Sequence, residues 1–472
     1  MNRFLAIDVG AESGRAMLGS LDNGRLALEE LHRFPNTPVR LPTGLYWDTL
    51  RLFHEIRHSL AICGRERRIA LDGIGVDTWG VDFALLGSDG ALVDNPRHYR
   101  DARNNQITMD KAFVSVPPQE IFAETGIQFM PINTIYQLSA MTLAKSPGLG
   151  IAKTLLFTPD LFNYWLSGVV RAEVSIASTS QFYNPVTNDW AKGLLRKLGI
   201  AESMLPEIVP SGTRLGTLLP EVAEASGLSP DTPVFATASH DTASAVAAVP
   251  ADGADWGYIS SGTWSLMGVE LDAPVINEHS AVLNFTNEVG AGGKIRLLKN
   301  IAGLWLLQEC RRAWALAGRE SSYAELVELA AVAPSSGMTL DPDAFPHPGH
   351  MPEQIAEHCR TLGLHPPDQP GGMVRLILES LAASYRKVLG NLETLTGRRI
   401  NRIHIVGGGS RNELLNQLAA NAMDRTVIAG PAEATAAGNV LVQAIGAGIV
   451  SGVSEAREIV RRSFEIQIHE PR

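Results

Sequence analysis

Residues 6–15, AIDVGAESGR, carry the strand and the turn that decide the predicted fold. The apolar run FLAIDVG (4–10) predicts a strand, which delivers Asp8 to the start of a turn of small residues. Two further strand-like segments follow, GRAMLGSL (14–21) and LALEELHRF (26–34), with Asp-Asn-Gly between them. The N-terminal segment therefore predicts a three-stranded meander in place of a βαβ unit.

The turn after the first strand predicts an anion-binding loop. Gly10, Ser13 and Gly14 would let backbone amides approach a phosphate, and Arg15 would add positive charge. Asp8 would repel that phosphate unless a metal ion lay between them, so the combination indicates a Mg-nucleotide. A plain β-hairpin with a capped turn is the alternative interpretation of the same residues.

The second motif is VFATASHDTASAVAAV (234–249), where a His-Asp pair lies inside a run of small and apolar residues. Asp241 would reach a substrate hydroxyl and accept its proton during phosphoryl transfer, and His240 would orient a sugar. The alternative is structural, because Asp241 followed by TASAVAAV is a good signal for a helix N-cap.

Two later turns fit contacts with a nucleotide. In WGYISSGTWSLMGVEL (256–271), two strands flank a turn where Thr263 would donate to a β- or γ-phosphate, with a tight hairpin as the alternative. In INRIHIVGGGSRNELLNQL (400–418), a strand and three glycines precede a helix that begins near Ser410. The glycines (407–409) would let adenine and ribose lie against the backbone; a close strand-to-helix turn explains one glycine more easily than three.

A fifth motif, DTWGVDF (77–83), places Asp77, Trp79 and Asp82 around Gly80. An indole face together with carboxylates is suited to a polyol, and a buried Trp beside an exposed hairpin is the alternative. The sequence has no GxxxxGK[ST], no strand-to-helix GxGxxG and no HRD and DFG pair. P-loop and protein-kinase machinery are therefore excluded.

The chain length predicts more than one domain. At 472 residues it exceeds one ordinary core, and Pro, Gly and Asp in AAVPADGAD (247–255) predict a boundary there. We expect an N-terminal domain over 1–247 with the sugar site and the first phosphate loop, and a C-terminal domain over 248–472 that binds the nucleotide.

Composition and charge limit the classes of partner and the cellular compartment that we expect. A net charge of −10 argues against nucleic acid and anionic membranes. Three scattered cysteines and a first apolar run interrupted by Asp8 favour a reducing cytoplasm without export. The uncharged segment 434–453 predicts a helix packed inside a domain, with Asn439 and Gln443 on one face, and not a membrane span.

Taken in order, these motifs resemble the FGGY family of carbohydrate kinases, and the likeness covers essentially the whole chain. The blocks that carry it are AIDVGAESGR, HRFPN, GLYWD, IGVDTWGVDFALL, HYRDAR, TGIQF, NTIYQL, ASHDTASAV, SSGTWSLMG, LKNIAGLWLLQ, HIVGGGSRNELLNQL and VIAGPAEA. The resemblance implies an α/β protein with two ribonuclease H-like domains of the actin and hexokinase ATPase type and a cleft between them. It also implies ATP-dependent phosphorylation of a ketose sugar.

The resemblance implies a role for each matching residue. Asp8 would help to hold Mg²⁺, and Asp241 would accept the proton. The residues expected to bind ATP are Ala11, Glu12, Ser13, Gly14, Arg15, Thr263, Gln308 and Gly408. The residues expected to contact the sugar are Gly80, His240, Thr242 and Asn300. Glu12 departs from the pattern, because it places an extra negative charge near the phosphates.

Other functions remain open at the level of sequence. The fold and the ATP motifs do not choose the sugar, so a kinase for another ketose, such as L-fuculose or a pentulose, is one alternative. An actin- or chaperone-like ATPase would need an appended partner-binding region, and a sugar-sensing regulator would need a DNA-binding helix pair, and neither is found. A monomer and a small homo-oligomer are both compatible with the sequence.

Overall fold

The computed structural model describes residues 1–345 and 349–472, which form two compact units. Unit 1 comprises Met1–Pro250, Glu270–Leu297 and Ala434–Ser463. Unit 2 comprises Ala251–Val269, Leu298–Glu433 and Phe464–Arg472. Unit 1 therefore contains segments from both sides of the single boundary that the sequence analysis placed at 247/248, whereas unit 2 lies wholly after it.

The main sheet of unit 1 begins with the predicted meander. Its strands, in spatial order, are β13 (Thr213–Thr217), β14 (Pro233–Ala236), β6 (Gly73–Thr78), β1 (Asn2–Val9), β2 (Ser13–Asp22) and β3 (Arg25–Pro35). β1, β2 and β3 pair antiparallel, as predicted. β6 pairs parallel to β1, with Asp77 directly opposite Asp8, so two carboxyl-bearing residues meet at the ends of neighbouring strands.

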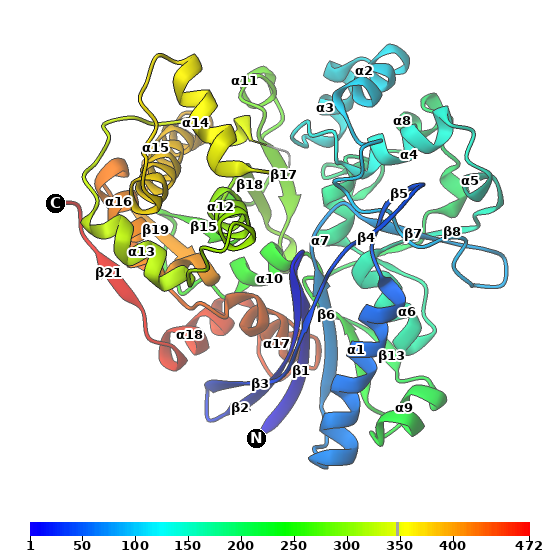
Figure 1. Cartoon of the computed structure of the whole chain (residues 1–472). Coiled ribbons are helices and arrows are strands. Elements are labelled where there is room, and N and C mark those ends of the chain that lie inside the picture. Colours follow the sequence, from blue (N-terminus) through cyan, green and yellow to red (C-terminus); the bar gives the residue numbers. More distant parts are fainter. Residues whose placement is uncertain (346–348) are drawn as a thin grey trace. The chain divides into compact units, whose positions relative to one another are not determined.

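Helices cover both faces of this sheet (Figure 1). Leu5 and Ile7 of β1 point into a core shared with α1 (Thr49–Ala61) and α6 (Thr158–Ser167). Successive strand residues face opposite sides, so Asp8 lies on the other face, which α17 (Ala434–Gly446) covers. Glycines allow α17 to approach: a Cβ at Gly75 would lie 2.7 Å from Asn439 Oδ1.

A smaller part of unit 1 is built on β7 (Phe83–Leu86) and β8 (Thr154–Phe157), which pair antiparallel. Alternate side chains of both strands, such as Phe83 and Phe157, enter a second core. The other helices of unit 1 are α2 (Gln106–Ser115), α3 (Pro118–Thr125), α4 (Thr134–Leu143), α5 (Pro147–Ile151), α7 (Val174–Ala177), α8 (Lys192–Lys197), α9 (Pro220–Ser226), α10 (Asp241–Ala247), α11 (Glu278–Val282) and α18 (Val453–Ser463). Its short strands are β4 (Val39–Leu41), β5 (Gly44–Tyr46), β9 (Ala172–Glu173), β10 (Tyr183–Asn184), β11 (Asp189–Trp190), β12 (Ile208–Val209) and β17 (Thr286–Val289).

The strand arrangement of unit 2 resembles that of unit 1. Its strands, in spatial order, are β18 (Ile295–Ala302), β16 (Trp264–Leu271), β15 (Trp256–Ser261), β19 (Arg402–Val406), β20 (Thr426–Ala429) and β21 (Gln467–His469). β15 and β16 form the predicted hairpin, and β19 runs parallel to β15, as β6 does to β1 in unit 1. The helices are α12 (Trp305–Leu316), α13 (Tyr323–Val332), α14 (Met351–Thr361), α15 (Pro370–Thr396) and α16 (Glu413–Met423).

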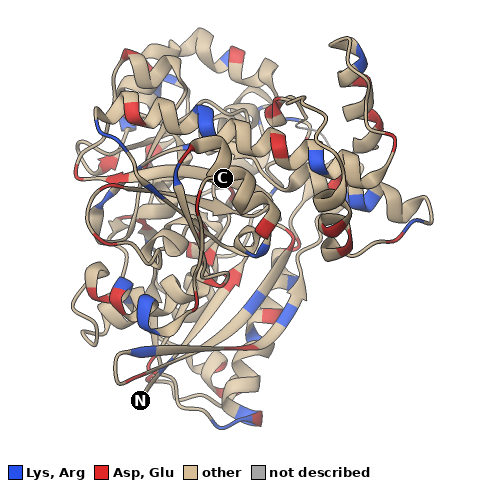
Figure 2. Ribbon diagram, turned by 90° about the vertical axis from the view of Figure 1, so that its left-hand side faces the viewer, with Lys and Arg blue, Asp and Glu red and all other residues tan. Residues whose placement is uncertain are grey.

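Several properties expected from composition can be compared with the structure. In the described residues, no helix has the length and apolar character needed to cross a membrane. Cys63, Cys310 and Cys359 are free and buried. Figure 2 shows Lys and Arg interspersed with Asp and Glu over the described elements in that view, so basic residues do not gather on one element there.

Candidate active site

Asp8 and Asp77 form the base of the candidate site in unit 1. Asp77 is fully buried, and its Oδ2 accepts a 2.5 Å hydrogen bond from Asn439 Nδ2. Its Oδ1 has no hydrogen-bond partner among the described residues. Burial raises the pKa of Asp77 well above its usual value, and the charges of Asp8 and Asp241 add to that increase. Three carboxyl groups therefore act on one another in this part of unit 1.

The predicted phosphate loop is the hairpin turn between β1 and β2. Arg15 Nη2 lies 2.6 Å from Asp8 Oδ2, so its charge already compensates the carboxylate. Gly14 has a packing role, because a Cβ there would lie 2.1 Å from the Phe34 ring. Glu12 is exposed and its neighbours Ala11 and Ser13 are half-buried. The turn thus has the hairpin geometry of the structural alternative and also carries the Asp8–Arg15 pair.

Asp241 is the first residue of α10, and His240 is its N-cap residue, without a side-chain capping bond. The alternative in which Asp241 itself is the N-cap is therefore wrong. The Asp241 side chain is 30% exposed, and its Oδ1 accepts a 3.0 Å hydrogen bond from Thr242 Oγ1. A hydrogen bond thus holds one carboxylate oxygen of Asp241, while the side chain remains partly exposed to solvent.

A buried ion pair supports the ring of His240. Glu288 Oε2 lies 3.2 Å from His240 Nδ1, and Arg296 Nη2 lies 3.1 Å from both of these atoms. On its other side, His240 Nε2 lies 3.5 Å from Asp241 Oδ1. Burial acts to raise the pKa of Glu288, but the hydrogen bond with His240 and the charge of Arg296 outweigh it and leave that pKa below its usual value. Glu288 is therefore a buried carboxylate in its charged form.

The arrangement of these groups favours one protonation of His240. A bare Nε2 would turn its lone pair toward the Asp241 carboxylate, whereas an Nε2–H is attracted to it. When the ring is neutral, its Nδ1 can accept from Arg296; when it is protonated, Nδ1 can donate to Glu288. Only the protonated ring can donate to Glu288 and to Asp241 at the same time, so this is the form that places a proton on the nitrogen facing Asp241 whatever the partner of Nδ1.

Glu173, at the end of β9, fixes the backbone that carries the His-Asp pair. Its Oε2 accepts from the backbone N–H of Ser239 at 3.1 Å and from Ser175 Oγ at 2.5 Å. Ser175 Oγ in turn accepts the N–H of His240 at 3.1 Å. All of these groups are buried, and Glu173 thus fixes the backbone at Ser239 and, through Ser175, at His240.

The Gly80 turn is positioned by its neighbours. A Cβ at Gly80 would lie 3.2 Å from Thr179, whose Oγ1 accepts the N–H of Val81 at 3.1 Å. Asp82 is fully buried and accepts from Trp47, Trp79, Gln137 and the backbone of Tyr99. The interpretation of Asp82 as a polyol ligand is therefore wrong, because its oxygens are used inside the core.

Unit 2 brings two of the predicted residues, Thr263 and Gln308, onto adjoining segments. Thr263 lies in the β15–β16 turn, and its carbonyl accepts from the N–H of Trp305, where α12 begins. Gln308 follows on α12, and its buried Oε1 has no hydrogen-bond partner in the described chain. Asn300, on β18, is half-buried.

The triple glycine also meets the β15–β16 turn. Gly407 has a positive φ of 83°, and a Cβ on Gly409 would lie 2.0 Å from Ser261 Oγ, so both positions require glycine for structural reasons. A Cβ on Gly408 would meet nothing within 4 Å. Gly408 is thus the glycine for which packing gives no reason, and it adjoins open space.

Glu288 and Arg296 were not identified by the sequence analysis. Each is a charged residue within an apolar run, in NFTNEV (284–289) and IRLL (295–298). The same signal drew attention to His240 and Asp241, and it was present here.

Almost the whole chain is similar to known proteins. Residues 3–248 match the N-terminal domain and residues 257–447 the C-terminal domain of the FGGY family of carbohydrate kinases. The chain belongs to this family. It is 45% identical over 471 residues to a rhamnulokinase from Bacteroides thetaiotaomicron, covering 99% of this chain and 96% of that protein. It is 40% identical over 472 residues to a rhamnulokinase from Enterococcus faecalis, covering 99% and 94%.

Solved structures share the fold. A ligand-bound xylulose kinase from Lactobacillus acidophilus matches with a TM-score of 0.82 at 17% identity, covering 100% of this chain and 94% of that one. A glycerol kinase from Plasmodium falciparum, solved with ADP, matches with a TM-score of 0.79 at 15% identity, covering 100% and 95%. The predicted α/β fold of the actin and hexokinase ATPase type is confirmed.

Proposed function

We propose that this chain transfers the γ-phosphoryl group of ATP to the C1 hydroxyl of L-rhamnulose. The observation that carries the choice of sugar is the 45% identity, over almost the whole of both chains, to a protein named for this activity. The geometry of unit 1 supports Asp241 as the residue that takes the proton. Fold alone would not choose among ketoses.

Asp241 is the base in this proposal. It takes the proton of the C1 hydroxyl as the new O–P bond forms and the bond from phosphorus to the ADP oxygen breaks. Thr242 and the Nε2–H of His240 both act on Oδ1, which leaves Oδ2 as the oxygen that receives the proton. The 3.5 Å contact is long for a hydrogen bond, and such contacts often tighten when substrate binds.

The carboxylates around Asp8 fit a hard divalent cation. Mg²⁺ prefers oxygen ligands and would neutralise charge on the transferring phosphoryl group. Asp8 would hold it, and Asp77, directly opposite Asp8, has a buried Oδ1 without a hydrogen-bond partner on the same face. The described residues contain no group of three or more His, Cys, Asp or Glu arranged to hold a metal ion by themselves, so most ligands would come from phosphate and water.

The remaining residues bind the two substrates in this proposal. Those assigned to the sugar are Gly80, His240, Thr242 and Asn300. Those assigned to the nucleotide are residues 11–15, Thr263, Gln308 and Gly408. The Oε1 of Gln308 and the open space at Gly408 support the second assignment, because a nucleotide could donate to the one and lie against the other.

A coupled assay of ADP release tests the proposal with L-rhamnulose, L-fuculose, L-ribulose, D-xylulose and glycerol as acceptors. We expect the highest kcat/KM with L-rhamnulose. A higher value with another ketose would overturn the sugar and keep the proton transfer, whereas ADP release that no sugar stimulates would overturn the kinase activity.

A further inference from the structure

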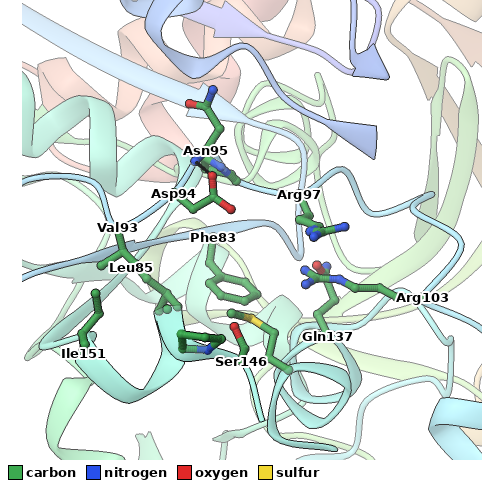
Figure 3. A pocket seen from close by; sticks show the side chains of 14 residues that line it. Phe83, Leu85, Val93, Asp94, Asn95, Arg97, Arg103, Gln137, Ser146 and Ile151 are labelled. Carbon is green, nitrogen blue, oxygen red and sulfur yellow. Dashed lines mark hydrogen bonds between the residues drawn. The ribbon is translucent and has the colours of Figure 1, made fainter. Parts of the chain in front are cut away.

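Unit 1 contains a cavity of about 370 Å³ beside β7 and α4. None of the residues proposed above to bind sugar or nucleotide lines it. Figure 3 shows Arg97, Arg103 and Gln137 grouped on one side and Leu85, Val93 and Ile151 on the other. A cavity of this size, with polar groups converging on one side, has the form of a small-molecule site.

Asp101 faces both arginines, Asp94 also lines the cavity, and Arg97 Nη1 donates a further hydrogen bond to the carbonyl of Thr43. Asp101 Oδ2 lies 3.6 Å from Arg97 Nη1, and Asp101 Oδ1 lies 3.9 Å from Arg103 Nε. The same carboxylate accepts the backbone N–H groups of Leu45 and Arg103. Arg103 Nε is buried and has no hydrogen-bond partner among the described residues. Burial, followed by the charge of Arg97, lowers the pKa of Arg103 to about 10. One carboxylate thus serves two cations and leaves a donor unused.

Gln137 supplies an unused acceptor in the same place. The residue is 1% exposed, and its Nε2 donates to Asp82 Oδ1 at 2.8 Å and to Ile132 O at 2.9 Å. Both partners are acceptors, so they identify Nε2 and fix the orientation of the amide. The opposite atom of the amide is therefore Oε1. That atom is buried without a hydrogen-bond partner in the described chain. An unpaired buried amide oxygen is unfavourable, and a donor from a ligand would satisfy it.

We propose that this cavity binds a small hydroxylated oxyanion, a sugar phosphate or a sugar acid. The guanidinium groups of Arg97 and Arg103 receive the oxyanion, since planar N–H donors match phosphate and carboxylate oxygens. A ligand hydroxyl donates to Gln137 Oε1. The C–H face of the carbon skeleton lies against Leu85 and Val93.

The cavity is connected to the proposed sugar site by one amide. Gln137 Nε2 also lies 3.3 Å from the carbonyl oxygen of Val81. Val81 follows Gly80 in the chain and has a positive φ of 69°. A ligand on Oε1 therefore acts on the group that holds the Gly80 turn. This link predicts that occupancy changes the KM for the sugar, which rests on the proposed function.

Calorimetric titration of the full chain tests the site, with D-glucose 6-phosphate, D-glucuronate, D-glucose and inorganic phosphate as separate probes. We expect one of the two sugar anions to bind with a Kd below about 1 mM, at least tenfold tighter than glucose or phosphate alone. Excess L-rhamnulose should not displace it. Equal binding of inorganic phosphate would overturn the role of the hydroxylated skeleton, and no binding of either sugar anion would overturn the site.

Two variants locate the binding. Arg103→Gln removes the charge, and Ser146→Phe fills the cavity from a half-buried position whose side chain makes no capping bond. Both should lose binding at least tenfold, while Arg196→Gln, an exposed arginine outside the cavity, keeps it. Unchanged melting temperature in Ser146→Phe keeps the result interpretable if Arg103→Gln fails to fold. Binding retained in Ser146→Phe would overturn the location. A sugar KM that does not respond to a bound anion would overturn only the link through Gln137.

Discussion

Asn439 on α17 donates a 2.5 Å hydrogen bond to Asp77 at the end of β6, across 362 residues of sequence. Asn439 Oδ1 in turn accepts from Gln443 Nε2 at 2.7 Å, so the amide is fixed from both sides. A helix from the C-terminal part of the chain thus fixes the orientation of the buried Asp77 carboxyl group, which lies opposite Asp8.

Replacing Asn439 with Ala should therefore destabilise unit 1. The change leaves a buried carboxyl without its donor, which costs about 1–3 kcal/mol of unfolding free energy. Urea unfolding measures this, with Asn421→Ala on the exposed side of α16 as a control that should change little. An Asn439→Ala protein as stable as the parent would show that the bond contributes nothing.

Asp241→Asn should remove the carboxylate that accepts the proton while keeping the size and shape of the side chain. We expect kcat to fall about 10²- to 10⁴-fold, the usual contribution of a positioned base, while the Kd for ATP stays the same. Single-turnover rates together with equilibrium ATP binding separate the two effects. A variant with nearly normal turnover would remove Asp241 from its assigned role.

Glu288→Gln should impair turnover through His240. The neutral amide no longer stabilises a protonated ring, so Asp241 loses part of its orientation and kcat should fall about 10- to 100-fold, as for other partners that orient a functional histidine. ¹⁵N NMR of labelled histidines would show whether Nε2 carries the proton, with His240→Gln used to assign the signal. Glu202→Gln, in an exposed pair with Arg196, is the matched control. A bare Nε2 in the parent protein would contradict the argument.

The triple glycine offers an internally controlled pair. Gly408→Ala should leave stability unchanged, because its methyl enters open space, and should raise the KM for ATP about tenfold. Gly409→Ala should instead lower the unfolding free energy by about 1–3 kcal/mol through its clash with Ser261. Thermal unfolding and the ADP-release assay measure the two effects. Normal ATP kinetics in Gly408→Ala would argue against its nucleotide contact.

Asp82 predicts a pH-dependent signal in the core of unit 1. Burial raises the pKa of Asp82 to about 6, while the hydrogen bonds it accepts oppose this increase. Because this pKa lies above that of the unfolded chain, the folded state binds the proton more tightly, so Asp82 stabilises most below about pH 4 and this contribution is lost as the pH rises through 6.

The two indoles that donate to Asp82 report its ionisation. Trp47 and Trp79 both bond to Oδ2, so intrinsic fluorescence should change with a midpoint near pH 6. Asp82→Asn should remove the transition. A midpoint that persists in that variant would assign the signal to another group.

Local patterns predicted the strands and helices well where one element buries one face. The meander and the β15–β16 hairpin follow the patterns of their apolar residues, and the helix expected within 434–453 is α17. The helix after the triple glycine begins at Glu413 and not at Ser410, because a short 3₁₀ turn intervenes and Asn412 caps it.

The candidate site was predicted in part. Asp8, Arg15 and the His-Asp pair lie in motifs with local signals, whereas Glu288 and Asn439 reach the site from segments far along the chain. Single-sequence patterns do not specify such tertiary partners. The ligand roles of the individual residues stay predictions, to be tested as above.

The covering of the first sheet by α17 has a consequence for synthesis. When residues 1–250 have left the ribosome, the face of their sheet that bears Gly75 and Asp77 still lacks its helix, because residues 434–446 are made later. α17 packs tightly at Gly438, where a Cβ would lie 1.7 Å from Ser244 O, so no larger residue fits at this position. The nascent N-terminal segment therefore lacks the cover for this sheet face until residues 434–446 have also been made.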